Sequence, residues 1–69
     1  MRFHDHYVVA GFSAPDTESP EEARVFKGVE APVEASRHMA KRGMVVMTYG
    51  PFANDVIANS VRDALFASV

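Results

Sequence analysis

Aromatic and β-branched residues follow one another near the start of the chain, and this run predicts a β-strand from His6 to Ser13. Alternation along the strand places His4, His6, Val8, Ala10 and Phe12 on one face and Phe3, Asp5, Tyr7, Val9 and Gly11 on the other. Gly11 indicates either a bulge or a close approach of another segment to the backbone.

Two more strands are predicted further along the chain. Residues Arg24 to Val29 alternate over a short run, and Met44 to Tyr49 is the strongest strand pattern and the expected central strand. Gly50-Pro51 ends it sharply. Between the first two strands, Ala14 to Glu22 contains two prolines and four carboxylates and is predicted to be a solvated loop.

Composition predicts a helix from Pro32 to Arg42. Pro32 suits the first turn, Lys41 and Arg42 favour the C-terminal end of the helix dipole, and Gly43 suits the residue that ends a helix. Helical spacing predicts a second helix from Pro51 to Val69, with Pro51 in its first turn and Asn54 as an alternative cap. Its expected core stripe is Ala53, Ile57, Val61, Ala64, Leu65 and Ser68.

The predicted order is β-β-α-β-α, a single α+β domain over residues 1–69 with a two- or three-stranded sheet and two helices. Met39 and Met47 are expected to fill gaps in the core, because methionine adapts to irregular space. A core of this size gives roughly 3–5 kcal/mol of net stability. The chain has no cysteine to form disulfides, so self-association is the expected source of additional stability.

Net charge and apolar patterning limit the class of partner. A formal charge of −2 argues against a protein that coats nucleic acid, which needs an excess of Lys and Arg. No apolar run approaches the ~20 residues of a membrane span, and the start of the chain lacks a signal-peptide pattern. A cytoplasmic protein is expected.

The second helix carries more apolar residues than its core stripe needs. Phe52, Val56 and Phe66 lie outside the stripe, and Tyr49 lies at the end of the preceding strand. These four residues are the predicted partner-binding set. The sequence predicts a homodimer through the C-terminal helix and contact with a larger host or cellular protein.

The sequence contains no recognisable catalytic motif, and we expect neither an enzyme nor a cofactor. His4-Asp5-His6 is the one metal-like cluster, but two histidines do not define a zinc site and the expected metal site is none. The scattered serines and histidines show no nucleophile arrangement.

A basic cluster on the first helix supports an alternative function. Arg37, His38, Lys41 and Arg42 form a broad positive surface at four-residue spacing. It is either an ordinary solvated face or a site for anionic groups, and in a dimer it would lie near the acidic loop. The leading prediction is a small non-enzymatic binding protein, of phage or mobile-element origin, that regulates or inhibits a larger protein. The alternative is a dimer that binds nucleotides or other small anions.

Overall fold

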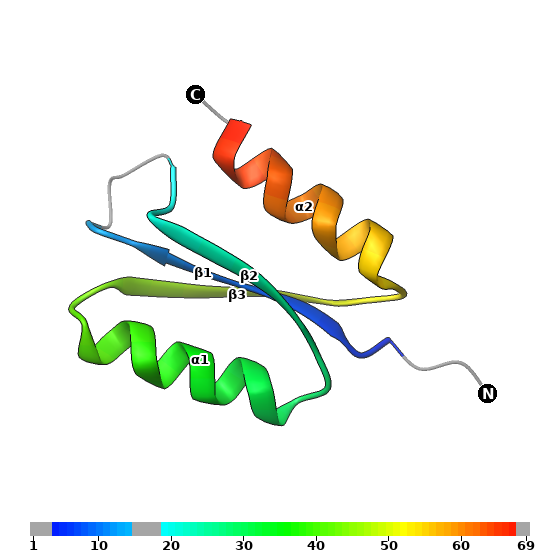
Figure 1. The fold of residues 1–69 in the computed structure, drawn as a ribbon, viewed down its shortest axis with the longest axis horizontal. Coiled ribbons are helices and arrows are strands. Elements are labelled where there is room, and N and C mark those ends of the chain that lie inside the picture. The colour runs from blue at the N-terminus through cyan, green and yellow to red at the C-terminus, as the bar shows by residue number, and fades with distance from the viewer. Residues whose placement is uncertain (1–3, 15–18, 68–69) are drawn as a thin grey trace.

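The computed structural model describes residues 4–14 and 19–67 and confirms the predicted α+β fold with the order β-β-α-β-α (Figure 1). The elements are β1 (His6–Phe12), β2 (Glu22–Lys27), α1 (Glu30–Lys41), β3 (Val45–Phe52) and α2 (Asp55–Ala67). The second strand therefore begins two residues earlier and ends two residues earlier than predicted, and α1 begins two residues earlier.

The three strands form one sheet in the order β2-β1-β3. Both outer strands run antiparallel to β1, so β2 and β3 run parallel to each other and α1 connects them. The prediction that the strand near Met44–Tyr49 is central is wrong, because β1 is central and β3 is an edge. The physical reason is the unbroken buried run from Val8 to Phe12, which suits a strand covered on both faces.

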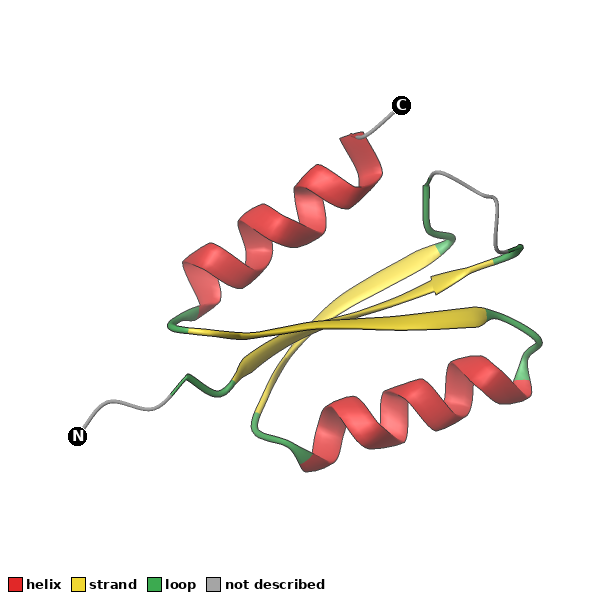
Figure 2. Cartoon of the chain, turned by 180° about the vertical axis from the view of Figure 1, so that it is seen from behind, coloured by secondary structure: helices red, strands yellow, loops and turns green. Residues whose placement is uncertain are grey.

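The two helices cover opposite faces of the sheet, which is seen edge-on in Figures 1 and 2. Val9 and Gly11 face α1, since a Cβ added to Gly11 would press against the sulfur atoms of Met39 and Met44. The predicted close approach at Gly11 is thus confirmed. By alternation, Val8 and its neighbours two residues apart face α2. The core consists of side chains packed above and below β1.

The junction of β3 and α2 differs from the prediction. The strand continues through Gly50 and Pro51, which are joined by a cis peptide bond, and α2 begins only at Asp55. Gly50 has a φ of +125°, and a Cβ there would lie 2.9 Å from the carbonyl oxygen of His6, so glycine allows the strand to continue beside β1. Asn54 is the cap, because the Ile57 N–H donates to its Oδ1 at 2.9 Å.

The buried side of α2 is centred on Ala58, which the predicted stripe omits. Ile57 and Ala64 are exposed, whereas Val61 and Leu65 are half-buried at the helical spacing from Ala58. Ser68 and Val69 lie outside the described residues. The predicted stripe was counted from Ala53, which precedes the first residue of α2, and the observed buried side of the helix is rotated from that stripe toward Ala58.

The two methionines predicted for the core have different environments. Met39 is 2% exposed and lies between α1 and β1, as predicted. Met47 is 47% exposed, so its predicted core role is wrong. An edge strand that is only partly covered by α2 leaves this side chain open.

Neither α1 nor α2, the helices within the described ranges, has the length and apolar character to cross a membrane.

Candidate functional site

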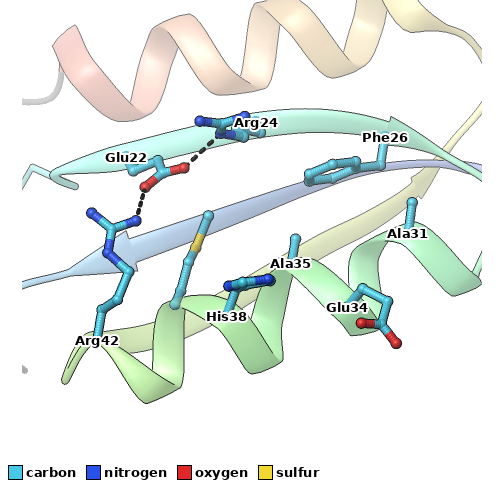
Figure 3. A pocket seen from close by; sticks show the side chains of 9 residues that line it. Glu22, Arg24, Phe26, Ala31, Glu34, Ala35, His38 and Arg42 are labelled. Atoms are coloured by element: carbon cyan, nitrogen blue, oxygen red, sulfur yellow. Dashed lines mark hydrogen bonds and ion pairs between the residues drawn. The ribbon is translucent and has the colours of Figure 1, made fainter.

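A groove of about 590 Å³ lies between β2 and α1 (Figure 3). It exists because α1 packs mainly over β1 and β3, which leaves the same face of β2 open beside the helix. Alternation along β2 directs Glu22, Arg24 and Phe26 to this face. From α1, Ala31 and Ala35 line it one turn apart, and their small side chains leave the space unfilled.

The groove has an apolar floor and a charged rim. Its floor is formed by Phe26, Ala31, Ala35 and Met39. Its rim is formed by Glu22, Arg24, Glu34, His38 and Arg42. With histidine neutral, the two carboxylates and the two guanidinium groups of the rim carry no net charge. The groove is therefore suited to apolar side chains surrounded by polar groups, rather than to a strongly charged ligand.

Glu22 is the electrostatic centre of the rim. Its carboxylate accepts a hydrogen bond from Nε of Arg24, and its other oxygen accepts one from Arg42 at 2.9 Å (Figure 3). The hydrogen bond from Arg24, together with the contact from Arg42, lowers the pKa of Glu22 despite its partial desolvation. The carboxylate therefore stays ionised and is a weak proton acceptor, and it joins the edge strand to the end of α1.

The structure separates the predicted basic cluster into two parts. Arg37, His38 and Lys41 line a second hollow of about 160 Å³ together with Glu34. Arg42 turns toward the groove and binds Glu22 instead. Glu34 also lies 3.5 Å from Arg37, which offsets part of the positive charge. Arg42 of the basic cluster thus contacts Glu22 of the predicted acidic loop within one chain, while Asp16 and Glu18 of that loop lie outside the described residues.

The predicted partner-binding set is also divided. Tyr49 and Phe52 are half-buried on the face of the sheet that α2 covers, since they pair with Val8 and His6. Val56 and Phe66, by contrast, are 69% and 44% exposed on α2. Val56 is two residues from buried Ala58, about 160° around the helix, so it points away from the sheet. The two strand residues and the two helix residues of the set therefore differ in exposure.

The histidines near the start of β1 do not assemble a metal site. His6 Nδ1 lies 3.1 Å from Oδ1 of Asp5, and His4 is exposed. Within residues 4–14 and 19–67, no group of three His, Cys, Asp or Glu side chains could hold a metal ion. Among the described residues, the polar start of β1 therefore brings His6 next to the carboxylate of its neighbour Asp5.

Sequence reasoning missed the groove. Phe26, Ala31 and Ala35 are each unremarkable in the sequence, and only the packing of α1 away from β2 brings them together. The one usable signal was the pair of alanines four residues apart on α1, which marks a narrow side of a helix.

Comparisons with protein-family models, curated proteins and solved structures found no match to this chain.

Proposed function

We propose that this protein is a small non-enzymatic binding protein that regulates or inhibits a larger protein by holding an apolar segment of it in the groove between β2 and α1. The observation that carries the proposal is the apolar floor inside a rim whose charges offset one another. Burial of the partner's apolar side chains on this floor would contribute roughly 25 cal/mol of binding free energy per Å² of apolar surface removed from water. A rim without net charge offers polar contacts to the partner but does not attract a strongly charged ligand.

The rim electrostatics favour binding over proton-transfer chemistry. A catalytic carboxylate that acts near neutral pH needs a raised pKa, whereas the pKa of Glu22 is lowered by its two arginines. Glu34 is exposed and lies beside Arg37. These groups are arranged to hold each other in place, which suits a preorganised binding surface.

The shape of the groove favours a helical or extended segment as the occupant. Its volume of about 590 Å³ is enough for a few apolar side chains, and grooves of this kind bind amphipathic segments through spaced apolar anchors. The partner segment would place these anchors over Phe26 and Ala35. A cytoplasmic location suits a chain without cysteine.

Filling the groove tests the proposal. Ala35→Leu places a larger side chain on the floor, and Ala40→Leu adds the same side chain at an exposed position of α1 outside the groove. Both changes preserve helix propensity. In an affinity capture from host lysate with quantitative mass spectrometry, a genuine partner is retained by wild type and Ala40→Leu and lost with Ala35→Leu. Equal capture of every protein by all three baits would contradict the proposal.

The alternative, an anion- or nucleotide-binding protein, is supported by the hollow that Arg37, His38 and Lys41 share. Arg42 is not part of it. A thermal shift assay with a panel of nucleotides and inorganic phosphate tests this second function, because a ligand that binds only the folded state raises the melting temperature. Stabilisation that disappears in Lys41→Gln would support it, and no shift with any anion would exclude it.

A further inference from the structure

The two edges of the sheet differ in charge. The eight residues of β3 include no Asp, Glu, Lys or Arg, whereas the six residues of β2 include Glu22, Arg24 and Lys27. Edge strands expose unpaired backbone N–H and C=O groups, and charged side chains normally keep other strands away from them. The β2 edge has this protection and the β3 edge does not.

Apolar side chains gather around the unprotected edge. Of the seven large apolar residues exposed in the described ranges, two belong to β3 and three to the segments that precede and follow it: Val45 and Met47, then Val29, Val33 and Ile57. Val45 and Met47 belong to β3 itself, and Ile57 lies in the first turn of α2, which follows β3 directly. Ser36 Oγ lies 3.5 Å from Thr48 Oγ1, so this side of α1 faces β3. Val33 and Val29 lie on the same side, one and two turns before Ser36.

We propose that a second copy of this chain pairs along β3, with the two strands antiparallel about a two-fold axis and the two sheets joined into one of six strands. A strand edge complements its own copy, because each unpaired donor finds an acceptor on the symmetry-related strand. No like charges oppose each other there, and the same apolar residues meet from both sides. Pro51 lacks an N–H, so pairing covers Val45 to Tyr49.

The dimensions of the molecule are adequate for this contact. The principal extents are 39 × 26 × 12 Å, and the sheet is edge-on when viewed down the shortest axis (Figures 1 and 2). The β3 edge and the flanks of both helices therefore lie on the broad side of the molecule, and the 39 × 26 Å outline of this side is larger than the ~800 Å² per partner that a stable interface buries.

The charged β2 edge limits the assembly to two copies. Pairing between β2 strands would bring Glu22, Arg24 and Lys27 of two chains together, so the joined sheet does not extend further. The contact does not depend on the proposed function, because the groove lies at the β2 edge and stays open in the dimer. A dimer would carry two grooves, one at each end of the joined sheet.

Sedimentation of the full chain tests the proposal. Wild type is expected as a species of twice the 7.6 kDa chain mass, and Met47→Lys, which puts a charge on the exposed edge, should weaken dimerisation at least about tenfold. The matched control is Val56→Lys, which adds the same charge to an apolar residue exposed on α2 away from the edge. It should leave the dimer intact.

Three results would overturn the proposal: a wild type that is monomeric at concentrations on the order of 100 µM, species larger than a dimer, or loss of the dimer in Val56→Lys but not in Met47→Lys. The last result would place the contact on α2, as the sequence predicted. Circular dichroism checks that each variant folds, and Thr48→Lys provides a second edge variant. Hydrogen exchange of the wild type adds an independent measurement, because β3 amides that face outward should exchange more slowly as concentration rises.

Discussion

Truncation of Val8 and Val9 to alanine tests whether both faces of β1 are covered. Both side chains are 0% exposed, and they point to opposite faces of the sheet, Val8 toward α2 and Val9 toward α1. A sheet with one covered face would make only one of these positions sensitive. With helices on both faces, we expect each variant to be destabilised by a similar amount.

The magnitude follows from burial. Removing two methyl groups costs about 1.6 kcal/mol of transfer free energy at about 0.8 kcal/mol each, and the cavity left behind raises the total to about 2–3 kcal/mol. In a domain of this size that loss lowers the melting temperature by roughly 10–20 °C. Since a small core supplies only about 3–5 kcal/mol in total, either variant removes about half of the stability.

Urea denaturation followed by circular dichroism at one fixed protein concentration measures these changes. Val56→Ala is the matched control, because this valine is 69% exposed in α2 and alanine has the higher helix propensity. It should change the free energy of unfolding by at most about 0.5 kcal/mol, in the stabilising direction. A loss below about 0.5 kcal/mol in either Val8→Ala or Val9→Ala would refute the two-sided burial of β1.

Three further substitutions give independent tests. Asn54→Ala removes the cap that accepts the Ile57 N–H and should cost about 1 kcal/mol in urea denaturation; an unchanged midpoint would show that the cap is not needed. Glu22→Gln should cost about 0.5–1 kcal/mol at neutral pH. Because the pKa of Glu22 in the folded state is below its usual 4.5, this contribution is present above that pH and is lost as the pH falls through the lowered value. A difference in unfolding free energy between wild type and Glu22→Gln that stays constant into acid would contradict this expectation. Gly50→Ala should cost more than Gly28→Ala: both have positive φ, but only at Gly50 does a Cβ meet backbone, and equal melting temperatures would rule out the contact.

Local patterns were sufficient to predict the order of the elements. The aromatic and β-branched content of β1, the capping preference of Asn54 and the helical composition before Gly43 all concern residues within a few positions of one another. The end of β3 was misassigned because Gly50-Pro51 is a typical strand terminator. Here the positive φ of Gly50 and its position beside His6 allow the strand to continue. That information lies in β1, more than forty positions away in the chain.

The candidate site could be predicted only in part. His38 and Arg42 were predicted as members of one basic cluster. Arg42 instead binds Glu22 and lines the rim of the groove. The exposed apolar residues Val56 and Phe66 were identified correctly as lying outside the core, while the exposed Met47 and Ile57 were assigned to it. Helical spacing shows which residues share a face, but not which strand that face covers.

The sequence alone determined the α+β class, the number of helices and the presence of apolar residues beyond the needs of the core. The tertiary structure decided that β1 is central, that α1 leaves β2 uncovered to form a groove, and that β3 is an uncharged edge. The physical reason is that propensity and periodicity act over a few residues, whereas strand order and helix placement depend on burying surfaces from distant parts of the chain together.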